Sequence, residues 1–198
     1  MDFDLTVNYQ QDRIISSFEE VSFAQKITSL INSSGGKLLI GVNEKGKIIG
    51  IYPKDELENI PIVIANFCSN PIEYSSEVIE INNKLVLVLT FEKAIKIAAL
   101  SSDKTLVYYY RIDSTICIAN KIIVKLWSYE RELTPTSPSS LEAEEIVYKN
   151  INNITLSQLY TRTKLSKSVI DVTVSWLLFT KKVKMIFTDN HITYQHLS

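Results

Sequence analysis

Residues 32–42 read NSSGGKLLIGV and are followed by NEKG at 43–46 and KIIGI at 47–51. The paired glycines Gly35 and Gly36 follow an amphipathic segment near residues 18–32, and they predict the end of a helix because glycine takes positive φ without a Cβ clash. The short β-branched runs on either side of Lys45-Gly46 predict two strands joined by a tight turn. This stretch therefore indicates a domain in which helices and strands alternate.

The same order of elements resembles the Schlafen AlbA-like family, also called the divergent AAA family. The shared pattern is a helix, Asn-x-x-Gly-Gly, an apolar Gly-Val strand, a polar turn and Ile-x-Gly-Ile, and it runs here from Ser17 to Ile51. Further on, VYYYR at 107–111 is similar to a late family strand with a Tyr-x-Arg type motif. The resemblance covers residues 1 to about 130. It implies a mixed-sheet domain, a nucleic-acid partner and Arg111 as a phosphate ligand.

Some Schlafen-type proteins that resemble this domain cleave RNA through two acidic residues five apart and a third carboxylate after the Gly-Val strand. The resemblance places Asn8, Arg13 and Asn43 at these positions, so it implies that the carboxylates for metal-assisted cleavage are absent. A residual metal-dependent ribonuclease remains an alternative, because a one-residue shift of the alignment would bring in nearby carboxylates: Asp12, Glu19 and Glu44.

Residues 41–47 also match the phosphate-loop pattern GxxxxGK. Ile48 replaces the Ser or Thr that would bind magnesium, and an apolar segment follows where such a loop needs a helix N-terminus. We therefore expect no nucleotide cofactor and no catalysis. Cys68 and Cys117 are too few for a thiolate metal site and are typical of reduced core cysteines.

The composition is that of an ordinary globular protein, with 198 residues and a net charge of −1. No apolar run reaches the ~18 residues of a membrane-spanning helix. The acidic start MDFD lacks the basic region of a signal peptide. These features predict a cytoplasmic protein with no membrane partner.

The segment TPTSPSS at 134–140 predicts a linker, because its prolines and small polar residues sustain neither a helix nor a central strand. We expect an AlbA-like α+β domain at 1–133 and a small domain at 141–198. The first domain would add a helical patch at 55–69 and strands at 72–81, 84–91, 105–112 and 115–119.

The second domain has a different pattern. A helix is predicted at 141–151, a short one after the cap residue Thr155, and a third from the cap residue Ser166 to about Lys181. Val183 to Phe187 and Ile192 to Tyr194 predict a terminal hairpin. Three helices and a hairpin resemble a winged helix-turn-helix.

Charge favours nucleic acid as the partner of this second domain. Residues 141–198 hold seven Lys and Arg against five Asp and Glu, a charge of +2, while residues 1–140 carry −3. We predict a non-catalytic nucleic-acid-binding, transcription-regulator-like protein, with DNA favoured over RNA. The predicted phosphate-binding residues are Arg162, Lys164, Lys167, Lys181, Lys182 and Lys184.

The third helix is apolar on nearly every face, whereas a helix that reads a major groove should keep one face polar. Burial inside the molecule or in a homodimer is therefore favoured over groove reading. The alternative function is an oligomerisation module whose interface residues are Ile170, Val174, Trp176 and Leu178. Two histidines, His191 and His196, make a poor metal site without cysteine or clustered carboxylates.

Overall fold

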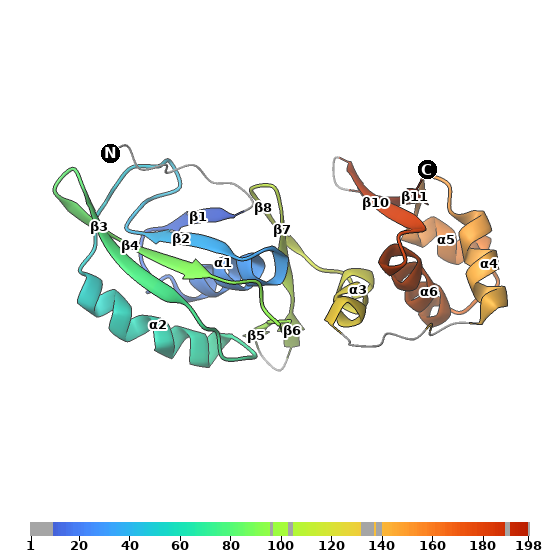
Figure 1. Ribbon diagram of the computed structural model, residues 1–198, viewed down its shortest axis with the longest axis horizontal. Helices are drawn as coiled ribbons and strands as arrows, with labels where there is room; N and C mark the ends of the chain where they lie inside the picture. Colours follow the sequence, from blue (N-terminus) through green and yellow to red (C-terminus); the bar gives the residue numbers. More distant parts are fainter. Residues whose placement is uncertain are drawn as a thin grey trace. The chain divides into compact units, whose positions relative to one another are not determined.

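The structure is a computed structural model that describes residues 10–95, 97–102, 105–131, 137, 140–188 and 191–197. The chain divides into two compact units, Met1–Ala119 and Asn120–Ser198; Figure 1 labels all of their elements except the short strand β9. None of the helices in the described ranges is both long and apolar enough to cross a membrane.

The N-terminal unit is built on a four-stranded mixed sheet in the order β1-β2-β4-β3, with β1 parallel to β2 and the other pairs antiparallel. The part of this unit that the structure describes also has two helices and two short antiparallel strand pairs, β5 with β6 and β7 with β8. The elements are β1 (Gln11–Ile14), α1 (Glu20–Ser33), β2 (Gly36–Ile40), α2 (Pro53–Phe67), β3 (Ser75–Ile81), β4 (Lys84–Phe91), β5 (Leu100–Ser102), β6 (Thr105–Val107), β7 (Tyr109–Ile112) and β8 (Thr115–Ile118). The expected α+β class is confirmed.

Successive side chains of a strand point to opposite faces of the sheet. Both faces of β2 are buried, because its alternate side chains pack in two different apolar clusters. Leu38 and Ile40 pack in one cluster with Phe23 and Ile27 of α1. Leu39 belongs to a second cluster with Val86 and its neighbours on β4. The continuous apolar run after the paired glycines is therefore a central strand.

The paired glycines end the helix as the sequence predicts. The backbone N–H of Gly35 donates to the carbonyl of Leu30 at 2.9 Å, and the φ angles of Gly35 and Gly36 are +77° and +143°. A Cβ on Gly36 would lie 2.2 Å from the carbonyl oxygen of Gln10. Glycine is thus required where the chain enters β2 beside the start of β1.

The predicted second strand at 47–51 is reduced to one bridge, between Val42 and Ile48. Strand β2 already pairs with β1 on one side and β4 on the other, so no edge of β2 is left for this segment. The chain instead curls back, and the N–H groups of Ile49 and Gly50 both donate to the carbonyl of Gly41.

Among its described residues, the C-terminal unit has four helices and a three-stranded antiparallel sheet in the order β10-β11-β9. Its elements are α3 (Lys121–Arg131), α4 (Leu141–Asn150), β9 (Ile154–Thr155), α5 (Leu156–Arg162), α6 (Lys167–Phe179), β10 (Val183–Thr188) and β11 (His191–His196). Thr155 and Ser166 cap α5 and α6 through their side chains. The three helices and the hairpin expected after residue 140 are all present.

Helix α3 was not expected, and it moves the boundary between the units. Ile122 lies in the C-terminal core, and its carbonyl accepts a hydrogen bond from Ser175 Oγ at 3.1 Å. The division therefore falls between Ala119 and Asn120 rather than at the predicted linker. Of residues 134–140, only Ser137 and Ser140 are among the described residues.

Candidate functional site

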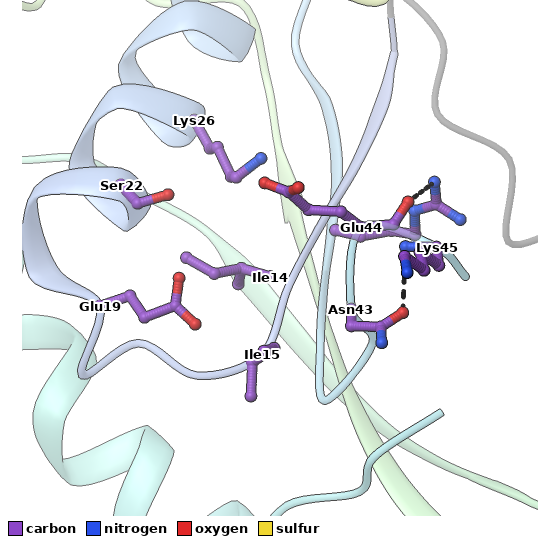
Figure 2. Close-up of a pocket in the computed structure, with 9 residues that line it drawn as sticks. Ile14, Ile15, Glu19, Ser22, Lys26, Asn43, Glu44 and Lys45 are labelled. Atoms are coloured by element: carbon purple, nitrogen blue, oxygen red, sulfur yellow. Dashed lines mark hydrogen bonds between the residues drawn. The ribbon is translucent and has the colours of Figure 1, made fainter. Parts of the chain in front are cut away.

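A pocket of about 320 Å³ opens in the N-terminal unit between the end of β1, the start of α1 and the turn after β2. Figure 2 shows Ser22 and Lys26 projecting from α1 toward that turn. A smaller hollow of about 200 Å³ shares Arg13, Lys26 and Glu44 with it. The pocket is lined by Arg13, Ile14, Ile15, Glu19, Ser22, Lys26, Asn43, Glu44 and Lys45.

Two of the three positions where the resemblance looks for carboxylates, Arg13 and Asn43, line this pocket. Asn43 Oδ1 accepts hydrogen bonds from the backbone N–H groups of Lys45 and Lys47 at 3.0 and 2.9 Å. Arg13 Nη2 donates to the carbonyl of Glu44 at 2.8 Å. Both side chains therefore hold the turn in place. The third position, Asn8, lies outside the described residues.

Asp12 lines the smaller hollow and is the centre of a buried charge network. Its side chain is 5% exposed, and Asp12 Oδ2 lies 2.5 Å from Nη1 of Arg111, whose side chain is fully buried. Asp12 Oδ1 accepts from Lys26 Nζ at 3.0 Å and from the N–H of Arg13 at 2.7 Å. Arg111 Nη2 also donates to the carbonyl of Ser114. The guanidinium of Arg111 is thus unavailable to a phosphate, contrary to expectation.

The carboxylates behind the ribonuclease alternative have different surroundings. Glu19 and Glu44 are exposed and line the pocket, whereas Asp12 is held between two cations. Within the described ranges, His, Cys, Asp and Glu side chains form no group of three or more that could hold a metal ion.

The GxxxxGK segment lacks the structural context of a phosphate loop. After Lys47 the chain forms the Val42–Ile48 bridge, and the next helix, α2, begins at Pro53. The backbone N–H groups of a helix N-terminus, which would bind the phosphates, therefore do not follow this loop.

A second candidate site is the connection between α5 and α6 in the C-terminal unit. Arg162 ends α5, Lys164 lies in the connection and Lys167 begins α6, and all three side chains are exposed. None of the three forms an ion pair with a carboxylate of the described chain. Their charges therefore face solvent around one short connection.

The other three predicted phosphate ligands lie near the opposite end of α6. At 1.5 Å per residue, this 13-residue helix is about 20 Å long, so Lys167 and Lys181 are well separated. Lys182 Nζ lies 2.5 Å from Glu144 Oε1 of α4, and Lys184 is half-buried on β10. The six cations consequently form two groups, and Glu144 already pairs with one of them.

Helix α6 has apolar side chains on nearly every face, and other elements of its own unit cover several of these faces. Ile170 and Val174 are fully buried in the C-terminal core, so they cannot line the predicted surface interface. Trp176 and Leu178 are half-buried. The Trp176 ring packs against Tyr129 of α3, with ring centroids 5.7 Å apart, so α3 provides much of the expected cover.

The remaining sequence candidates have ordinary structural roles. His196 stacks on Tyr148, with a centroid separation of 4.2 Å, and its Nε2 lies 2.9 Å from the carbonyl of Tyr148. Cys68 is buried, and burial raises the pKa of its thiol to about 12. Helix α3 was missed although Asn120 caps it, with Oδ1 accepting from the N–H of Ile123. An Asn cap followed by apolar residues is a sequence signal for the start of a helix, and it could have predicted α3.

A family model described as Schlafen, AlbA_2 matches residues 4–120, which is more than half of the chain. The chain belongs to the Schlafen AlbA_2 family. The matched residues of this AlbA_2 chain include the pocket and the Asp12 network, and they end at the start of the C-terminal unit.

Solved structures give weaker similarities. The DIP2311 protein from Corynebacterium diphtheriae is 13% identical with a TM-score of 0.47, and the match covers 91% of this chain and 30% of that protein. The N-terminal domain of a RecG-related protein from Nitrosomonas europaea is 19% identical with a TM-score of 0.39, covering 52% and 75% of the two chains. The AlbA_2 chain thus spans less than a third of the DIP2311 protein. No curated protein matches it.

Proposed function

We propose that this AlbA_2 protein binds nucleic acid without catalysis, with DNA favoured over RNA, as a transcription-regulator-like protein. The observation that carries the proposal is the group of three exposed cations around the α5–α6 connection: Arg162, Lys164 and Lys167. Cations that face solvent can neutralise backbone phosphates and release the counterions bound there.

The order of elements in the C-terminal unit supports a winged helix-turn-helix. Helices α4, α5 and α6 are followed by the hairpin β10–β11, and β9 adds a third strand to its sheet. In such domains the second helix of the pair presents its N-terminal residues to DNA. Here the first turn of α6 is exposed and the middle of the helix is buried. We therefore expect contacts mainly to phosphates, with few base contacts.

The N-terminal unit supports the non-catalytic part of the proposal. Arg13 and Asn43 both hydrogen-bond to the turn after β2, and Asp12 is neutralised by Lys26 and Arg111. A carboxylate that is paired with two cations is a weak ligand for a divalent metal.

The proposal is tested with the full chain, a labelled 20-base-pair DNA duplex and fluorescence anisotropy at 50 to 200 mM salt. Each phosphate contact contributes about −0.9 to the slope of log K against log salt. Replacing Arg162, Lys164 and Lys167 with Ala should therefore flatten the slope by about 2.7. A labelled single-stranded RNA of equal length tests the preference for DNA.

The matched control replaces three exposed lysines of the N-terminal unit with Ala: Lys37, Lys54 and Lys93. This change removes the same charge, so a general effect of net charge would weaken binding equally in both triple variants. The proposal fails if the wild-type chain binds neither DNA nor RNA at 50 mM salt, or if the control loses as much affinity as the test variant.

A further inference from the structure

A cluster of four polar side chains joins three helices beside the α5–α6 connection. Tyr160 of α5 donates its hydroxyl hydrogen bond to Asp171 Oδ1 of α6. The other oxygen of Asp171 is ion-paired with Lys121 Nζ of α3. Lys121 Nζ and Lys167 Nζ each lie 5.4 Å from the centroid of the Tyr160 ring. One aromatic ring therefore has two ammonium groups as neighbours.

The charges in this cluster do not cancel. Asp171, whose side chain is 11% exposed, is one carboxylate against the two cations Lys121 and Lys167. Arg162 and Lys164 add two further positive charges on the adjoining connection. The surface around Tyr160 therefore has a net positive charge, which attracts anions most strongly at low salt.

Lys121 is held in place and still open to solvent. Its side chain is 58% exposed, and hydrogen bonds to Asp171 and Tyr160 raise the pKa of its ammonium group, which keeps it charged. An ammonium has three N–H donors. The ion pair with Asp171 engages one side of this ammonium group, and its exposure leaves donors for a ligand in solvent.

Tyr160 and Asp171 fit the role of positioning residues. Burial, together with the hydrogen bond to Asp171, raises the pKa of the Tyr160 hydroxyl, so the hydroxyl remains a donor to that carboxylate. Both oxygens of Asp171 are engaged by groups of this unit. The pair thus fixes the N-terminal end of α3 relative to α6.

We propose that Lys121 and Lys167, whose ammonium groups both neighbour the Tyr160 ring, form a site for one backbone phosphate of nucleic acid, and that Asp171 positions Lys121 for it. The inference rests on the proposed nucleic-acid function and deepens it, because it assigns a ligand to α3, which lies outside the predicted helix-turn-helix. Ammonium groups bind phosphate oxygens through short charge-assisted hydrogen bonds.

The test compares Lys121→Gln with Lys125→Gln in the full chain, using the same labelled duplex. Lys125 is the matched control because it lies one turn later on α3, where its Nζ is 4.8 Å from the Tyr129 ring. Lys121→Gln should lower affinity about three- to tenfold at 100 mM salt and flatten the salt slope by about 0.9. Lys121→Arg should restore the slope, because it restores the charge. If Lys121 had only a structural role, its replacement would leave the slope of log K against log salt unchanged.

A second measurement uses the wild-type chain and needs no variant. Lysine acetylation followed by mass spectrometry, with and without the duplex, should show protection of Lys121 and Lys167 and none of Lys125. A poly-glutamate peptide serves as the competing anion. Protection by this peptide and none by DNA would overturn the assignment to a phosphate.

The failures of the two proposals can be told apart. If the wild-type chain does not bind the duplex, the proposed function fails, and the phosphate site fails with it. If the chain binds and depends on Arg162 and Lys164, while Lys121→Gln matches wild type in slope and Lys121 is not protected, only the site at Tyr160 is overturned.

Discussion

Asp12→Asn tests whether Arg111 serves the fold rather than a ligand. Asparagine keeps the shape of the side chain and removes its charge, which leaves the fully buried guanidinium of Arg111 facing a neutral amide. Removing one partner of a buried ion pair costs about 3–5 kcal/mol. Lys26 is 15% exposed and can turn toward water, so it adds little to this cost. We expect the N-terminal unit to lose about 3–4 kcal/mol of unfolding free energy.

Urea unfolding can follow the two units separately. Both tryptophans, Trp127 and Trp176, belong to the C-terminal unit, so tryptophan fluorescence reports that unit while far-ultraviolet circular dichroism reports both. With an m-value of about 2 kcal/mol per molar urea, the midpoint of the N-terminal transition should fall by about 1.5–2 M. The fluorescence transition should stay close to that of wild type.

The control is Glu58→Gln, which breaks an exposed ion pair with Lys54 at 3.9 Å, the two side chains being 70% and 86% exposed. Exposed pairs contribute about 0–1 kcal/mol, so little change is expected. A loss below about 1 kcal/mol for Asp12→Asn would refute the reasoning. A steeper salt slope of DNA binding without a loss of stability would instead return Arg111 to the list of phosphate ligands.

Two further predictions concern the N-terminal unit. Gly36→Ala should cost about 2 kcal/mol or more and lower the thermal midpoint, because the new Cβ would lie 2.2 Å from the backbone oxygen of Gln10 at a φ of +143°; an unchanged midpoint would contradict the close approach. Burial raises the pKa of Cys68 to about 12, which leaves about one thiolate in ten thousand at pH 8. Mass spectrometry should therefore find iodoacetamide on half-buried Cys117 first, with labelling of both thiols rising as pH rises. Equal rates would disprove this order.

The features that the sequence predicted well depend on local chemistry. The glycine pair Gly35-Gly36 ends α1 because of its own backbone freedom, and the side chains of Thr155 and Ser166 cap the helices that directly follow them. Each of these signals acts within a few residues of the chain. Family resemblance singled out the positions of Arg13 and Asn43, and both side chains line the N-terminal pocket.

The features that the sequence missed depend on contacts between distant residues. Strand β1 has four residues and is defined by its parallel pairing with β2. The resemblance implied that Arg111 binds a phosphate, and nothing in the sequence indicated its buried ion pair because the partner, Asp12, lies 99 residues earlier in the chain. Ile48 could not join a strand because β1 and β4 occupy both edges of β2. Neither composition nor periodicity carries this information.

The position of the unit boundary changes the electrostatic argument for nucleic-acid binding. Counted from Asn120, the C-terminal unit has ten Lys and Arg against seven Asp and Glu, a formal charge of +3, and the N-terminal unit has eleven against fifteen, or −4. Two of those eleven cations, Lys26 and Arg111, form ion pairs with Asp12. The net negative charge of the N-terminal unit therefore repels a backbone phosphate, and the net positive charge of the C-terminal unit attracts it. The salt dependence of binding should consequently follow Lys121 and the α5–α6 cations.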